Sequence, residues 1–266
     1  MHPDPRPVHR RVSSVTSALM LCALLVSFVG FAPIPLAHAA SVIYVKPGGT
    51  GTGLSWDSAK DLAAALSAAT TGDELWVATG TYTPGSLRAD TFTLKDGVTI
   101  YGGFAGLVTE TLTTRDWATN VVTLSGDLNR DDGPSFANNT DNSYHVVTGA
   151  TGATLDGVTI SGGNANDWNN NNDPYGGGMY NFNSSPILTN VTISGNTADS
   201  GGGMYNTYNS SPTLTNVTIS GNSTTNVGGG MCNDTSSNPV LTNVTISGNS
   251  TTSYGGGMYN GSSSPT

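Results

Sequence analysis

The fold is decided by the segment Gly176-Gly177-Gly178-Met179-Tyr180-Asn181, which recurs in residues 201–206, 228–233 and 255–260. The only substitution among these copies is Cys232, which takes the place of the tyrosine. The methionines at 179, 204, 231 and 258 set a period of about 26 residues. A fixed period in this range, with strand-type residues and glycine or asparagine corners, is typical of a solenoid of stacked coils. The glycines recur without the lysine or the helix of a phosphate loop, so we interpret them as tight bends.

A second phrase, Leu188-Thr189-Asn190-Val191-Thr192-Ile193-Ser194-Gly195-Asn196, lies between the copies and returns in residues 214–222 and 241–249. Its third position is Gly157 in a looser, earlier copy. Glycine and asparagine are the residues that best tolerate positive φ, so we expect a left-handed corner there.

The residues after this corner alternate as Val191, Thr192 and Ile193, which predicts a strand with one face in a core. Stacking of successive copies predicts columns of like side chains, with threonines outward and the asparagines at 196, 222 and 249 joined by amide hydrogen bonds. Each coil advances in one direction, and parallel crossovers are right-handed by strong default. The expected fold class is therefore all-β, a right-handed parallel β-helix.

Residues 1–39 are predicted to be a secretory signal peptide. Arg6, Arg10 and Arg11 form a basic start, an apolar run follows, and Ala37-His38-Ala39 is a small-x-small cleavage site. The apolar run is short for a bilayer span. We therefore expect the protein to be secreted or displayed at the cell surface, on the outer membrane, after cleavage.

Residues 40–94 are predicted to form an N-terminal cap and the first coil. A strand over 42–45, a helix from Asp57 or Ser58 to about Ala69, and a strand from Glu74 would together close one end of the stack. Residues 95–266 then make the coils. The last repeat stops at Thr266, where its sister copies continue, so we expect a fragment of a longer protein and any membrane association only through a missing C-terminal region.

The charge of the chain excludes one class of partner. Without residues 1–39 it keeps 6 basic and 17 acidic residues, a net charge of −11 against −9 for the whole sequence. No lysine or arginine follows Arg130. Such a surface repels phosphate backbones, so nucleic-acid binding is not expected. Cys232 occupies a tyrosine position and His145 is flanked by valines, and we expect both to be structural.

The loop Asp127-Leu128-Asn129-Arg130-Asp131-Asp132-Gly133 places oxygen ligands at alternate positions, like the start of a calcium loop. It departs from the EF-hand pattern because Asp132 stands at the glycine position. The candidate calcium ligands are Asp127, Asn129, Asp131 and Asp132. The alternative is a solvated acidic turn, in a protein without a cofactor.

A second loop, residues 164–174, is rich in asparagine and interrupts the repeat. Its Trp168 could stack on a sugar ring, and Asp167 and Asp173 could bind a cation. An exposed insertion without a role is the alternative, since solenoid insertions gather on one face.

The chain resembles known families in two places. Residues 74–82, Glu-Leu-Trp-Val-Ala-Thr-Gly-Thr-Tyr, resemble the opening strand of pectate-lyase-like right-handed parallel β-helix proteins. Gly177-Gly178-Met179 and Ile193-Ser194-Gly195-Asn196 resemble the paired motifs of polymorphic outer-membrane-protein repeats, with isoleucine in place of phenylalanine. The second resemblance implies a surface-displayed adhesin.

Two functions follow as hypotheses. The leading one is a non-catalytic, exported β-helix scaffold that contacts carbohydrate or another host or cell-surface ligand. The alternative is a polysaccharide lyase or glycoside hydrolase of the pectate-lyase-like superfamily, for which Asp127, Asp131, Asp132 and Arg130 would be the first candidates.

Overall fold

The computed structural model describes residues 40–168 and 174–266. The predicted signal peptide and Asp173 lie outside the described residues.

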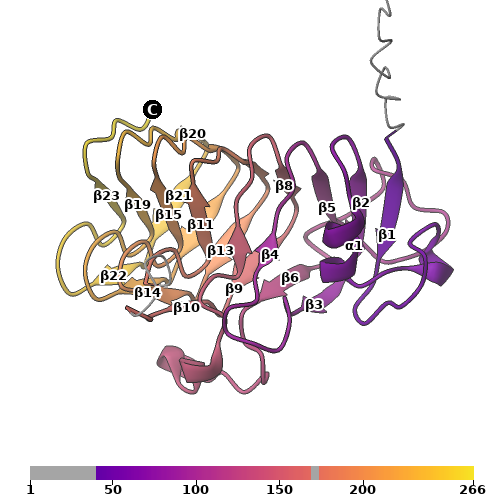
Figure 1. Ribbon diagram of the computed structural model, residues 1–266, viewed down its shortest axis with the longest axis horizontal. Helices are drawn as coiled ribbons and strands as arrows, with labels where there is room; N and C mark the ends of the chain where they lie inside the picture. The colour runs from indigo at the N-terminus through magenta and orange to yellow at the C-terminus, as the bar shows by residue number, and fades with distance from the viewer. Residues whose placement is uncertain (1–39, 169–173) are drawn as a thin grey trace, which may run out of the picture. The chain divides into compact units, whose positions relative to one another are not determined.

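The described strands form four parallel sheets, each built from strands of successive coils (Figure 1). In sheet order, the seven-stranded sheet contains β1 (Val42–Val45), β2 (Glu74–Ala78), β5 (Thr99–Phe104), β8 (Thr154–Asp156), β12 (Ile187–Thr189), β16 (Thr213–Thr215) and β20 (Val240–Thr242). One six-stranded sheet contains β3 (Gly80–Tyr82), β6 (Val122–Ser125), β9 (Thr159–Ser161), β13 (Thr192–Ser194), β17 (Thr218–Ser220) and β21 (Thr245–Ser247).

The other two sheets complete the coil. The second six-stranded sheet contains β4 (Phe92–Thr93), β7 (Val147–Thr148), β11 (Met179–Phe182), β15 (Met204–Thr207), β19 (Met231–Asn233) and β23 (Met258–Asn260). The four-stranded sheet contains β10 (Asn164–Ala165), β14 (Thr197–Ala198), β18 (Ser223–Thr224) and β22 (Ser250–Thr251). Non-consecutive strands are neighbours in every sheet, which confirms the predicted right-handed parallel β-helix.

Like residues are paired with like, as the repeat phrases predict. Ile193 pairs with Ile219, and Ile219 with Ile246; Met179, Met204, Met231 and Met258 form a second column. Ile193, Ile219 and the first three methionines are fully buried, each side chain contributing roughly 1.5–3 kcal/mol to folding. The core is therefore a set of apolar columns along the axis of the coils.

The predicted asparagine column is also present. Asn196 Nδ2 donates to Asn222 Oδ1 over 3.0 Å, and Asn222 Nδ2 donates to Asn249 Oδ1 over 2.9 Å. A second amide column lies inside β11, β15, β19 and β23, where Asn181, Asn206, Asn233 and Asn260 form the same bond in series. These bonds fix the register of each coil on the next.

The predicted left-handed corner is confirmed in every copy. Asn190, Asn216 and Asn243 have φ of 53°, 56° and 52°, and Gly157 has φ of 76°. The repeated Gly-Gly-Gly-Met segment has a structural role as well, because the backbones of successive coils lie close together there. A Cβ atom on Gly203 would lie 2.5 Å from the carbonyl oxygen of Gly230.

The N-terminal helix begins later than the sequence predicts. A 3-10 helix, η1 (Trp56–Ser58), is followed by an extended segment, and α1 (Leu62–Ala68) starts only after Asp61, whose carboxylate accepts the backbone N–H of Ala63. The predicted start at Asp57 or Ser58 is wrong because the backbone of Lys60 bonds to that of Tyr44 and Lys46, beside β1. The predicted apolar face of α1 is correct, since Leu62, Ala65 and Leu66 are buried.

Across residues 40–168 and 174–266, the helices are too short and too polar to span a lipid bilayer.

Candidate functional site

The acidic residues of the first predicted site lie in the long excursion between β6 and β7, which carries two 3-10 helices, η2 (Pro134–Phe136) and η3 (Asn139–Asp141) (Figure 1). Several residues of this excursion adopt positive φ, among them Arg130 at 60° and Asn138 at 66°. Asn138 Nδ2 donates to the carbonyl of Asp131, which joins the two halves of the loop. The excursion therefore folds back on itself.

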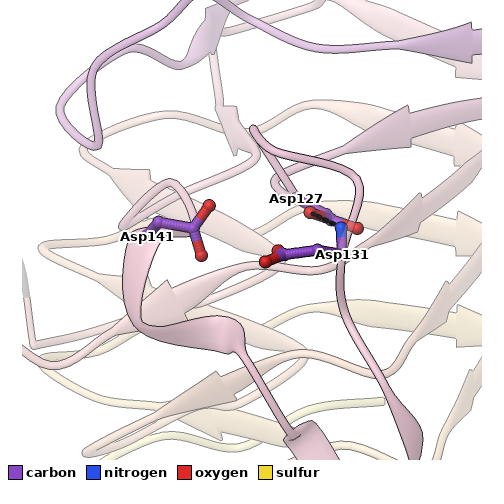
Figure 2. Close-up of side chains that lie close together, drawn as sticks. All are labelled: Asp127, Asp131 and Asp141. Carbon is purple, nitrogen blue, oxygen red and sulfur yellow. Dashed lines mark hydrogen bonds between the residues drawn. The ribbon is translucent and has the colours of Figure 1, made fainter.

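That fold-back brings three carboxylates together. Asp127, Asp131 and Asp141 each offer an oxygen that lies within 4.8 Å of the other two. Figure 2 shows Asp141 facing Asp131 and Asp127 from the opposite side of the loop. The backbone N–H of Asp131 donates to Asp127 Oδ1 over 3.2 Å, so one side of the cluster is fixed by the chain itself. Three carboxylates at this separation repel one another unless a cation neutralises them.

Buried polar atoms beside the three carboxylates also indicate that a cation could be bound here. In the described chain, Asp141 Oδ2, Asn142 Oδ1 and Ser143 Oγ are buried and lack a hydrogen-bond partner within the protein. Such groups are normally satisfied by water, an ion or protein. Oxygen atoms are the ligands that calcium prefers, so the residues present fit a hard divalent cation.

Asp132 lies beside the cluster and differs from it in role. Loss of solvent raises the pKa of Asp132, and the three carboxylates of the cluster raise it further, while a hydrogen bond from Asn142 Nδ2 over 2.7 Å opposes them. Asp132 is thus ionised less readily than a free aspartate.

The predicted ligand set and the observed cluster overlap only in part. Asp127 and Asp131 are brought together, Asp132 is engaged by Asn142, and Asn129 is exposed on the loop. Asp141 was not predicted, because it is remote in sequence and enters through η3.

A groove of ≈ 460 Å³ leads away from the acidic loop. It is lined by Asp127 and Asp132 at one end and continues over the corner glycines Gly162, Gly195 and Gly221 of three successive coils. A Cβ atom on Gly195 or Gly221 would meet open space, so no side chain covers the groove at these two glycines. The groove therefore crosses several coils beside the acidic loop.

Arg88 and Arg115 are engaged in structural contacts, whereas Arg130 is not buried. Arg88 donates from Nε to the carbonyl of Asn142 over 2.7 Å and from Nη2 to the carbonyl of Asn164 over 2.9 Å. Arg115 forms an ion pair with Asp156 at 2.5 Å. Arg130 is exposed on the acidic loop itself.

The second predicted site is partly described. Asp167 Oδ2 accepts a hydrogen bond from the Tyr144 hydroxyl over 3.1 Å. Trp168 is 65% exposed and meets the ring of Tyr175 edge-on at 6.2 Å. The structure therefore places Trp168 next to the ring of Tyr175, while Asp173 lies outside the described residues.

His145 and Cys232 have the structural surroundings that their positions predict. His145 Nδ1 donates to the carbonyl of Gly176 over 3.1 Å, and its ring stacks on Tyr180. Cys232 is buried between Tyr205 and Tyr259 in register, and burial raises the pKa of its thiol to about 12. A thiol in that state is not a nucleophile at neutral pH.

The chain can be compared with known proteins on this basis. The family described as "Protein of unknown function (DUF1565)" matches residues 47–261. The crystal structure of pectate lyase Pel9A is similar with a TM-score of 0.50 and 17% sequence identity, over 77% of this chain and 47% of that chain. This chain therefore spans about half the length of that enzyme, and the likeness shows a shared pectate-lyase-like fold alone. No curated protein sequence matches the chain.

Proposed function

The chain belongs to the DUF1565 family, and from that premise and its parallel β-helix we propose that it is an exported, non-catalytic scaffold that contacts carbohydrate. The stacked coils supply a rigid support, and the loops and grooves on their outer surface supply the contacts.

The observation that carries the non-catalytic part is the engagement of Arg88 and Arg115. A lyase that removes a proton next to a carboxylate needs a basic group free to approach its substrate. Arg88 is bound to the backbone carbonyls of Asn142 and Asn164, and Arg115 is paired with Asp156. Arg88 and Arg115 thus make contacts that stabilise the fold.

Calcium is proposed as a ligand of the acidic loop. Asp127, Asp131 and Asp141 would hold the ion, which would cross-link the two halves of the excursion and stiffen it. Its role in this proposal is structural.

The second candidate function is cleavage of an acidic polysaccharide. The groove that leads from Asp127 and Asp132 favours it, because a polymer lying there would pass beside these two carboxylates.

One experiment separates these two functions. The purified protein is incubated with pectins and other acidic glycans in the presence of calcium, and new chain ends are measured. The scaffold proposal predicts no release of shortened products. Sustained release that disappears in Asp131→Ala would replace it with the enzyme.

A further inference from the structure

An aromatic surface that neither the acidic loop nor the repeat phrase explains lies on the outer side of β11 and β15. Met179 and Asn181 point into the core, so alternation along the strand directs Tyr180 and Phe182 outward. Parallel pairing places Tyr205 beside Tyr180, with ring centroids 6.2 Å apart. The ring of Tyr175 stacks on Tyr205 at 4.8 Å. Rings from neighbouring coils are therefore assembled side by side.

Two further rings extend this stack toward solvent, since the ring of Phe182 lies 6.5 Å from that of Tyr180. Phe182 is 48% exposed and Tyr208 is 54% exposed, and their centroids are 4.6 Å apart. Between them and the stack lies an open groove of ≈ 320 Å³, at the lower end of the range for small-molecule sites, roughly 300–1,000 Å³. We call it the aromatic groove; it is lined by Tyr175, Tyr180, Phe182, Tyr205, Tyr208 and Asp234, with Thr207 and Thr235.

The turn that carries Tyr208 is repeated in neighbouring coils with other residues. Tyr208 has φ of 52°, in the left-handed region that a bulky residue seldom adopts. The equivalent turns of the next two copies hold Thr235 at 51° and Ser262 at 55°, so the turn does not require an aromatic residue. Folding of the turn therefore leaves the choice of side chain open, and the exposed ring of Tyr208 is available for binding.

The polar groups of the aromatic groove indicate the class of ligand. Asp234 and the hydroxyl groups of Thr207 and Thr235 can accept hydrogen bonds from hydroxyl groups, and the exposed ring faces can pack on apolar C–H faces. The sequence has no lysine or arginine after Arg130, so the surroundings repel carboxylated, sulfated or phosphorylated ligands. A neutral sugar combines many hydroxyl groups with an apolar ring face.

We propose that the aromatic groove binds a neutral pyranose oligosaccharide, with Phe182 and Tyr208 stacked on the sugar and Asp234 accepting its hydroxyl groups. This inference rests on the proposed carbohydrate contact and gives it a location and a ligand class. Because the aromatic groove is open, an oligosaccharide would be contacted along one side only. Internal segments of a polysaccharide could therefore bind as well as its ends.

The test is calorimetric titration of the purified protein with neutral fragments of β-1,4-glucan, β-1,4-xylan and β-1,4-galactan, and with oligogalacturonate for comparison. Binding of at least one neutral fragment is expected, weakened roughly tenfold in Tyr208→Ala and in Phe182→Ala. Tyr254→Ala, a matched change to a tyrosine that is 72% exposed and outside the groove, should leave the affinity unchanged.

Tyr208→Gly separates loss of the ligand site from loss of the fold. Glycine tolerates positive φ, so this variant should keep or raise the thermal midpoint while losing the sugar. If neutral sugar binding is unaffected by both Tyr208→Ala and Phe182→Ala, the aromatic groove is not the binding site, but the proposed carbohydrate-contacting scaffold function still holds. Absence of binding to every glycan, acidic or neutral, would overturn both. Self-association of the protein that is lost in Tyr208→Ala, without sugar binding, would assign the rings to a second copy and also refute the inference.

Discussion

The inner amide column makes a quantitative prediction for Asn206→Ala. Asn206 is fully buried, accepts a hydrogen bond from Asn181 Nδ2 over 2.8 Å and donates to Asn233 Oδ1 over 2.7 Å. Removal of its amide leaves one donor and one acceptor buried without partners, at about 1–3 kcal/mol each. We therefore expect the free energy of unfolding to fall by about 2–6 kcal/mol, a large part of the 5–15 kcal/mol typical of a domain.

Urea unfolding followed by circular dichroism measures this change, with the slope of the transition recorded because stacked coils can unfold separately. Asn226→Ala is the matched control, since Asn226 is exposed and its amide lies 3.5 Å from Asp199 Oδ2. The control should stay within about 0.5 kcal/mol of the parent. An equally small effect of Asn206→Ala would refute the reasoning that the amide column stabilises the coils.

Four further outcomes are expected. Gly203→Ala should destabilise by about 1–3 kcal/mol in the same urea assay, because its Cβ atom would meet the carbonyl of Gly230 at 2.5 Å, whereas Gly221→Asn at an open left-handed corner should be nearly neutral. Asp132→Asn should raise the thermal midpoint at pH 7 without calcium. The pKa of Asp132 is raised on folding, so its ionised form destabilises the folded protein above that raised pKa. The difference in thermal midpoint between variant and parent should therefore vanish below the ordinary pKa of 3.8. Cys232 should resist alkylation at pH 8 until the protein is unfolded, and rapid labelling of the native protein would contradict its burial. Calcium should raise the thermal midpoint and a chelator reverse the rise, and neither should act on Asp141→Ala; an equal calcium effect in that variant would place the ion elsewhere.

The periodic part of the fold could be predicted from the sequence because equivalent positions can be compared between successive copies of the repeat. Asn190 and Gly157 occupy one position in different copies, and only a left-handed corner suits both. The N-terminal helix has no such internal comparison. Its start was misplaced because backbone bonds from Lys60 to the residues around β1 override the local capping signal of Ser58.

The sites were harder to predict, since they combine residues that are distant along the chain. Asp141 reaches Asp127 only because the excursion folds back, and spacing within an irregular loop does not reveal that. The aromatic groove depends on which coil each ring is stacked on. Alternation along Met179-Tyr180-Asn181-Phe182 predicts that Phe182 lies on the outer side of the strand. The contact between Phe182 and Tyr208 depends in addition on the turn after β15, where Tyr208 has positive φ, and the alternation does not predict that turn.

The proposed carbohydrate contact without cleavage is tested most directly by nuclear magnetic resonance of the isotope-labelled protein titrated with a neutral oligosaccharide. The account predicts chemical-shift changes confined to residues around Tyr180, Phe182, Tyr208 and Asp234, with the sugar spectrum unchanged over time. Shifts centred instead on the loop of Asp127 and Asp131, accompanied by signals of shortened sugar, would contradict it.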